Sequence, residues 1–193
     1  MIGPLKAYVR VIDPMNRMIG RVVMYGIFVM MGILLWSSVS KAFFVPSLWT
    51  LEMAQFAMVA YYILGGPYSI QMGSNVRMDL IYGEMSDRRK AAIDTVTVVF
   101  LLVYLGFLLY GGIASTAYSF GYFGSEPIGF FAGLLTGNEE IGFMERSPTS
   151  WRPYLWPIKT IMVFGIMLMI LQVLCELAKD ILRLKGHDVG AKI

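Results

Sequence analysis

Apolar residues fill four long stretches of the chain, and charged or turn-forming residues separate these stretches. They cover about residues 18–40, 49–71, 92–118 and 154–178. Each is long enough to cross the hydrocarbon core of a bilayer, which takes about 20 helical residues. The pattern therefore predicts an all-α integral membrane protein, with four transmembrane helices in a single domain over 1–193.

Residues typical of helix starts precede these stretches. Asp13 and Pro14 suit an N-cap and a first helical position, while Pro46 and Pro153 precede the second and fourth stretches. Aromatic residues gather where a membrane meets water. The tryptophans all fall near one predicted boundary, and they are Trp36, Trp49, Trp151 and Trp156.

Two shorter segments have a pattern of their own. Near the N-terminus, apolar residues recur at helical spacing, and these are Leu5, Tyr8, Val9 and Ile12. This spacing is typical of a short amphipathic helix lying flat on the inner leaflet, and a frayed basic tail is the alternative. Residues 128–135 are apolar but too few to span. We expect them to form an interfacial or re-entrant part of a partly helical periplasmic loop between the third and fourth spans.

Basic residues lie mostly on one side of the predicted spans, and lysine and arginine are retained on the cytoplasmic side of a membrane. The side rich in basic residues carries Lys6, Arg10, Arg17, Arg21, Arg77, Arg88, Arg89, Lys90, Lys179, Arg183, Lys185 and Lys192. The opposite side carries Lys41, Arg146, Arg152 and Lys159. We therefore expect both termini to be cytoplasmic.

Composition agrees with a membrane protein and narrows its function. The chain has 193 residues, of which 57% are hydrophobic and 15% charged, and this excludes an ordinary soluble domain. The net charge of +3 is small and dispersed, so we expect no nucleic-acid partner. Cys175 is the only cysteine, which excludes an intrachain disulfide. His187 is the only histidine, which excludes a haem held between two transmembrane histidines.

The sequence carries no recognisable catalytic or metal-binding motif. It has no GxxxxGK[ST] phosphate loop, no HExxH, no GxSxG and no cluster of intramembrane aspartates. We therefore expect neither an enzyme nor a cofactor-binding protein. Four spans without an active site or an ion path are typical of one subunit in a larger assembly.

Polar residues in or beside the spans are the candidate functional residues, because a charge at the bilayer centre costs about 3 kcal/mol. Glu52 lies near the outer boundary, where it either contacts another helix or subunit or extends to water. Lys159 lies at a similar depth in the fourth span. Gln172 lies deeper, and a polar side chain there usually bonds to a neighbouring helix.

Several short motifs occur in an order and spacing that resemble a known family. They are Trp49-x-x-Glu52 at the entry of the second span, Leu64-Gly65-Gly66-Pro67-Tyr68 and Gly73-x-x-Val76-Arg77-Met78-Asp79 at its exit, and Trp151-x-Pro153-x-Leu155-Trp156-Pro157-Ile158-Lys159 before the last span. Together they resemble the small (Q-type) membrane subunit of tripartite ATP-independent periplasmic (TRAP) transporters, over nearly the whole chain. Gln55 departs from this pattern, since many members have a basic residue there.

The resemblance implies a scaffold subunit of a sodium-coupled secondary transporter in the bacterial inner membrane. A periplasmic substrate-binding protein would deliver an organic acid to two membrane subunits. The large TRAP membrane subunit would bind sodium and substrate, and the small subunit would brace it, surrounded by membrane lipids. A homo-oligomeric small channel or exporter is the alternative, although no span carries a continuous polar stripe.

The resemblance also implies roles at subunit contacts for particular residues. Contacts with the large subunit are expected for Glu52, Lys159 and Gln172. Trp151 and Arg152 would shape the periplasmic surface near the docked binding protein. A third group would lock the inner hairpin between the second and third spans, or contact the partner directly, and it consists of Arg77, Asp79 and Arg88.

Overall fold

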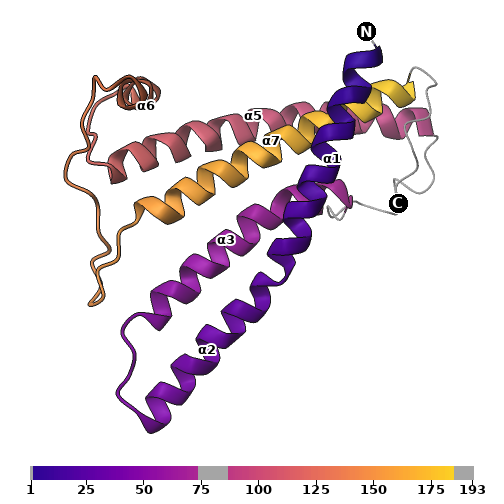
Figure 1. The fold of residues 1–193 in the computed structure, drawn as a ribbon. Helices are drawn as coiled ribbons and strands as arrows, with labels where there is room; N and C mark the ends of the chain where they lie inside the picture. The colour runs from indigo at the N-terminus through magenta and orange to yellow at the C-terminus, as the bar shows by residue number, and fades with distance from the viewer. Residues whose placement is uncertain (1, 74–86, 185–193) are drawn as a thin grey trace.

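The computed structural model describes residues 2–73 and 87–184 and shows a protein built from helices (Figure 1). Its described helices are α1 (Ile2–Met24), α2 (Gly26–Phe43), α3 (Thr50–Gln71), α5 (Asp87–Ser119), α6 (Pro127–Thr136) and α7 (Trp156–Leu184). Within the described ranges, β structure is limited to an isolated bridge between Arg146 and Tyr154. The predicted all-α fold class is confirmed.

Three helical stretches of the described chain are long and apolar enough to cross a membrane, and they are Leu5–Phe43, Val96–Ser119 and Trp156–Leu182. They correspond to the first, third and fourth predicted spans. Helix α3 has 22 residues and nearly coincides with the predicted span at 49–71. Its mean hydropathy is lower than that of the three stretches above, however, and α3 is not among the helices that qualify as candidate spans. The described residues thus support three spans by length and hydropathy, instead of the predicted four.

The N-terminal region is helical, which confirms the helical alternative of the sequence and rules out the frayed tail. Residues 2–24 form α1, which continues into α2 after a short break at Tyr25. Helix α1 is amphipathic as predicted, but it is longer than expected and packs against α3 and α7. Its position flat on the inner leaflet stays a prediction. Asp13 and Pro14 lie inside α1, and the predicted helix start at these residues is wrong. The Asp13 side chain contacts α7 instead of capping a helix.

Helix α7 is central in the arrangement, because it lies between α3 and α5 while α2 packs on the far side of α3 (Figure 1). Helix α1 crosses both α3 and α7 toward the end that carries Ile2 and Leu184 (Figure 1). Between α5 and α7 lies a hydrophobic core of Leu105, Ile166 and Val173. The apolar part of α7 is 39% buried, against 11% for α5 and none for Leu5–Phe43. The outer helices therefore leave most of their apolar surface for lipid or for a partner.

Two glycines allow the neighbouring helices to approach α7 closely. A Cβ atom built at Gly165 would lie 3.1 Å from the backbone oxygen of Ile63 on α3, and would overlap the Ile63 side chain. A Cβ atom built at Gly112 on α5 would lie 3.3 Å from Cγ2 of Val163. Small residues at such contacts are typical of helices that pack within a membrane.

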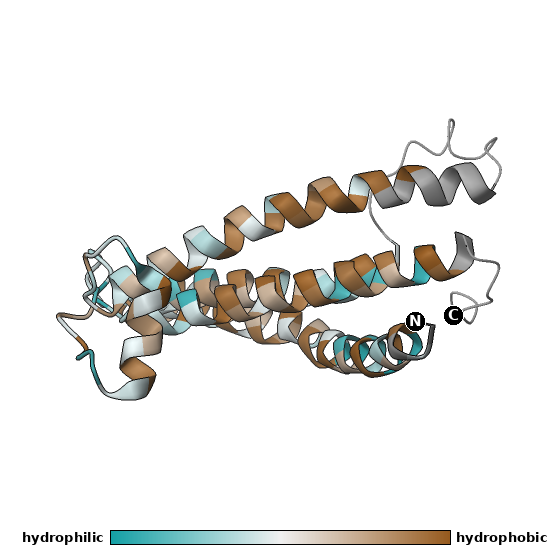
Figure 2. Ribbon diagram, turned by 90° about the horizontal axis from the view of Figure 1, so that it is seen from above, coloured by the Kyte–Doolittle hydropathy of each residue, from teal (hydrophilic) through white to brown (hydrophobic). Residues whose placement is uncertain are grey.

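We call the end of the molecule that carries Ile2 and Leu184 the tail end, and the opposite end the loop end. The loop end holds the α2–α3 turn and the long segment between α5 and α7 (Figure 1). Hydrophobic residues dominate the long helices, whereas hydrophilic residues gather in the loops and on α1 (Figure 2). Residues 128–135 lie in α6, which begins at Pro127 and ends before Gly137, a glycine with a φ of 75°. The ring of Phe130 stacks on Tyr122 and fixes α6 to the loop.

Candidate functional site

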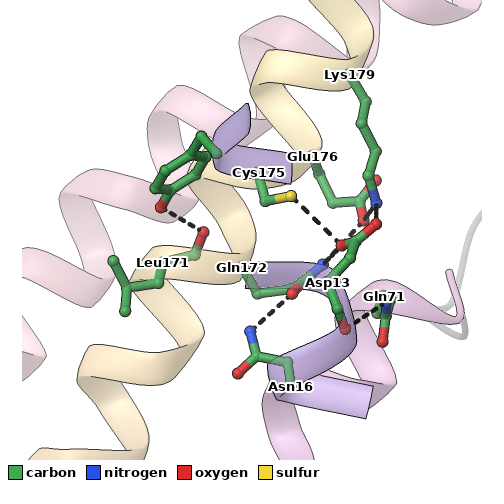
Figure 3. Close-up of polar contacts among 9 residues, drawn as sticks. Asp13, Asn16, Gln71, Leu171, Gln172, Cys175, Glu176 and Lys179 are labelled. Carbon is green, nitrogen blue, oxygen red and sulfur yellow. Dashed lines mark hydrogen bonds and ion pairs between the residues drawn. The ribbon is translucent and has the colours of Figure 1, made fainter. Parts of the chain in front are cut away.

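Polar side chains from three helices meet at the tail end and form what we call the tail-end cluster (Figure 3). Its members are Asp13 and Asn16 from α1, Gln71 from α3, and Gln172, Cys175, Glu176 and Lys179 from α7. The four residues of α7 have the spacing i, i+3, i+4 and i+7, which places them on a single face of the helix. That face meets the polar face of α1 where the two helices cross.

Lys179 is the positive centre of the tail-end cluster. Its Nζ lies 2.6 Å from Oδ2 of Asp13 and 2.8 Å from Oε1 of Glu176. Its side chain is only 12% exposed, so solvent screens these two ion pairs less than it screens surface pairs. Cys175 adds a thiol donor, whose Sγ lies 3.3 Å from Oδ1 of Asp13. One lysine thus balances a carboxylate from its own helix and one from α1.

The amide groups extend this contact into the interior. Gln172 is fully buried, and its Nε2 donates to Oδ1 of Asp13 at 3.0 Å and to Oε1 of Glu176 at 3.1 Å. Its Oε1 accepts a hydrogen bond of 2.7 Å from Nδ2 of Asn16. On the third helix, Nε2 of Gln71 donates to the backbone oxygen of Asp13 at 3.1 Å. The cluster therefore ties α1, α3 and α7 together at one point.

At the loop end, Lys159 and Glu145 connect the loop to two helices. Nζ of Lys159, on α7, donates to Oε2 of Glu145 at 2.6 Å and to the backbone oxygen of Ser115, on α5, at 3.2 Å. Ser119 donates to the same carboxylate at 2.7 Å. Burial alone would raise the pKa of Glu145, but the hydrogen bonds from Lys159 and Ser119 and the Lys159 charge outweigh it and lower that pKa.

Glu52 joins α3 to the same loop. Its side chain is 4% exposed, and its Oε1 accepts hydrogen bonds from Oγ of Ser147 at 2.8 Å and from the Thr149 hydroxyl. Its Oε2 is also buried and has no hydrogen-bond donor among the described residues. Glu52 therefore contacts its own chain at this position and does not extend to water.

Hydroxyl groups hold the α2–α3 turn at the loop end. Oγ1 of Thr50 donates to Oγ of Ser37 at 3.1 Å, and the hydroxyls of Ser47 and Thr50 lie 2.9 Å apart. Ser40 and Ser47 are linked at 3.2 Å. These hydrogen bonds hold the start of α3 next to the end of α2.

The remaining predicted site residues are dispersed. Trp151 and Arg152 lie in the loop and are exposed, and Arg152 adopts a left-handed backbone conformation with a φ of 51°. Arg77 and Asp79 lie outside the described residues. Arg88 belongs to the first turn of α5, but its side chain is not among those described. The predicted lock of the inner hairpin therefore stays a prediction.

Of the eight predicted residues, the structure brings three into internal polar contacts, and these are Glu52, Lys159 and Gln172. Sequence reasoning missed their partners, which are Asp13, Asn16 and Glu176 for Gln172, Glu145 for Lys159, and Ser147 and Thr149 for Glu52. The available signal was the spacing of polar residues on α7, since 172, 176 and 179 share one helical face.

The tail-end cluster and the loop-end contacts of Glu145 and Lys159 both fasten helices to one another or to the loop. Each joins oppositely charged or hydrogen-bonding side chains from different segments at distances of direct contact. Across residues 2–73 and 87–184, no group of three or more histidine, cysteine, aspartate or glutamate side chains is arranged to hold a metal ion.

Comparison with known proteins adds one finding. A family model described as "Tripartite ATP-independent periplasmic transporters, DctQ component" matches residues 30–183. No curated protein and no solved structure matches the chain significantly. The matched range includes α3, α5, α6, most of α2 and all but the last residue of α7, and it begins after α1.

Proposed function

Because the chain belongs to the DctQ family of small TRAP transporter subunits, we propose that it acts as a rigid brace for the large membrane subunit. It is a multi-pass membrane protein and a transporter component. The large subunit moves substrate across the membrane, and this subunit gives it a fixed surface to move against.

The observation that carries this proposal is the internal pairing of the polar side chains at both ends. Lys179 is paired with Asp13 and Glu176 at the tail end, and Lys159 with Glu145 at the loop end. A residue that binds and releases an ion in each cycle needs free coordination positions, whereas these charged groups are already paired within the chain. Contacts between helices that are worth about 1 kcal/mol each favour one fixed arrangement.

The tail end faces the cytoplasm of the bacterial inner membrane in this proposal, and the loop end faces the periplasm. The excess of lysine and arginine on the tail side supports this orientation. The loop that carries Trp151 and Arg152 then lies on the side of the periplasmic binding protein, which delivers an organic acid. Sodium and the organic acid bind the large subunit.

Co-purification followed by reconstitution tests the brace. We expect an affinity-tagged form of this chain to retain the large subunit during purification in detergent. Proteoliposomes that contain both subunits should accumulate a radiolabelled organic acid when its binding protein and an inward sodium gradient are supplied. Vesicles with either subunit alone should not. Sodium-driven uptake by this chain alone would contradict the proposal and would favour the homo-oligomeric transporter.

A further inference from the structure

Four basic residues of α1 lie along one face of the helix, and we call them the basic stripe. They are Lys6, Arg10, Arg17 and Arg21. At about 100° per residue, all four fall within an arc of about 60° around the helix axis. Arg17 is partly exposed and the other three are exposed. None of the four is ion-paired or hydrogen-bonded to a described residue.

The acidic residue of α1 does not balance these charges. Asp13 is the only carboxylate in the sequence of α1, and its Oδ2 lies 2.6 Å from Nζ of Lys179 on α7. Its Oδ1 accepts hydrogen bonds from Gln172 and Cys175. The basic stripe therefore presents four positive charges over about 22 Å of helix, and a row of this kind attracts an anionic surface.

The contacts of α1 with α7 place it where the hydrocarbon core ends. Helix α7 begins at Trp156, and about 20 of its residues cross a core of about 30 Å. Helix α1 crosses α7 about that far along (Figure 1). The Tyr8 hydroxyl donates to the backbone oxygen of Leu171 at 3.0 Å, and Asp13 contacts Lys179 two turns further on.

The length of the first helical stretch leads to the same level. Leu5–Phe43 has 39 residues, which is about 58 Å of helix and nearly twice the thickness of the core. Helix α2 alone has 18 residues and covers about 27 Å. Most of α1 therefore lies at or beyond the edge of the hydrocarbon, where phospholipid headgroups are found.

An exposed apolar edge runs beside the basic stripe on α1. Val11, Met18 and Val22 form it, and they are 62%, 66% and 68% exposed. This edge lies about 120° from the basic stripe and about 120° from the face that carries the buried residues Ile12 and Asn16. Helices that lie in a membrane interface combine an apolar face among the acyl chains with lysine and arginine at the headgroups. An acidic protein segment would match the charges but would leave the apolar edge uncovered.

We propose that the basic stripe binds the headgroups of anionic phospholipids, while Val11, Met18 and Val22 lie among their acyl chains. In the orientation proposed above, these lipids belong to the cytoplasmic leaflet. The family match begins at residue 30, so this site lies outside the matched range. The inference goes beyond the brace, because it gives α1 a ligand of its own and names the charge of that ligand.

Native mass spectrometry of the purified full chain tests this site. The protein in neutral detergent receives equal amounts of palmitoyl-oleoyl phosphatidylglycerol or of the phosphatidylcholine with the same acyl chains. The measured quantity is the ratio of lipid-bound to lipid-free protein. We expect the wild type to retain the anionic phosphatidylglycerol more than the zwitterionic phosphatidylcholine.

Arg10→Gln removes one charge from the basic stripe and should weaken phosphatidylglycerol binding about fivefold, the usual effect of one basic residue near an anionic membrane surface. Phosphatidylcholine binding should not change. Arg10→Lys keeps the charge and should retain most of the preference. Lys41→Gln is the matched control, because it removes one exposed charge from the opposite end of the molecule and should leave the preference as in the wild type.

Two results would overturn the inference. One is equal retention of the two lipids by the wild type, and the other is an equal loss of phosphatidylglycerol in Arg10→Gln and Lys41→Gln. If the wild type shows no lipid preference but Arg10→Gln weakens association with the large subunit, an acidic segment of that subunit occupies the basic stripe instead. The lipid measurement uses the isolated chain, so its failure leaves the brace standing, and failure of the subunits to co-purify leaves the lipid site standing.

Discussion

Replacing Lys179 by methionine tests whether the tail-end cluster fastens α1 to α7. The substitution keeps most of the length of the side chain and removes its charge. Asp13 and Glu176 would then lose the ammonium group that now lies within 2.8 Å of each carboxylate. Two carboxylates that share one lysine would face each other without a counter-charge, and α1 would lose its main polar attachment.

The expected size of the effect follows from the burial of the three side chains. Removing one partner of a fully buried pair costs about 3–5 kcal/mol, whereas exposed pairs contribute about 1 kcal/mol or less. The exposed fractions are 12% for Lys179, 23% for Asp13 and 20% for Glu176, so these pairs lie between the two limits. We expect a loss of about 2 kcal/mol, or about 4–8 °C in Tm for a chain of this size.

The assay is thermal unfolding of the purified protein in detergent, followed by size-exclusion chromatography. Lys41→Met is the matched control, because Lys41 is exposed on α2 and should change Tm little. Combining Lys179→Met with Asp13→Asn should recover part of the loss, since the asparagine oxygen still accepts the Gln172 amide without a second negative charge. The fastening role is refuted if Lys179→Met behaves like Lys41→Met, or if the second substitution adds a further full loss.

Three further predictions concern the loop end and the helix contacts. Glu52→Leu should remove the acceptor of the hydrogen bonds that the Ser147 and Thr149 hydroxyls now donate. The loss should lower the stability of the loop by about 1–3 kcal/mol and appear as faster hydrogen exchange there. The lowered pKa of Glu145 means that its contribution is complete above the ordinary value of 4.5 and is lost as pH falls through the lowered pKa. Acidification below that value should therefore lower the Tm of the wild type more than that of Glu145→Gln. Gly165→Ala should destabilise by about 1–3 kcal/mol because the added methyl meets Ile63, whereas Gly32→Ala, with open space around it, should be tolerated in the same melting assay.

The helices could be predicted well because each depends on local pattern. The predicted second span, 49–71, begins one residue before α3 and ends with it. The fourth was predicted to end at 178, but α7 continues to Leu184. Its last turns carry Glu176 and Lys179, which a hydropathy pattern assigns to the water boundary. Because Lys179 pairs with Asp13 on α1 and with Glu176, these charged residues are accommodated within α7 and the helix continues past them.

The polar clusters could not be predicted in the same way. Periodicity shows which side chains share a helical face, but not which helix that face meets. Asp13 and Lys179 are separated by most of the chain, and their contact depends on where α1 crosses α7. Asp13 before Pro14 also has the pattern of a helix start, and that local signal was wrong because the tertiary contact with Lys179 holds Asp13 inside α1.

The central claim is that this subunit stays rigid while the transporter works, and a disulfide between α5 and α7 tests it most directly. Gly112→Cys with Val163→Cys suits such a bond, since a Cβ at position 112 would lie 3.3 Å from Cγ2 of Val163. We predict that the oxidised double variant, reconstituted with the large subunit and supplied with the binding protein, transports within about twofold of its reduced form. Loss of transport on oxidation, restored by a reductant, would show that α5 and α7 must move and would contradict the brace.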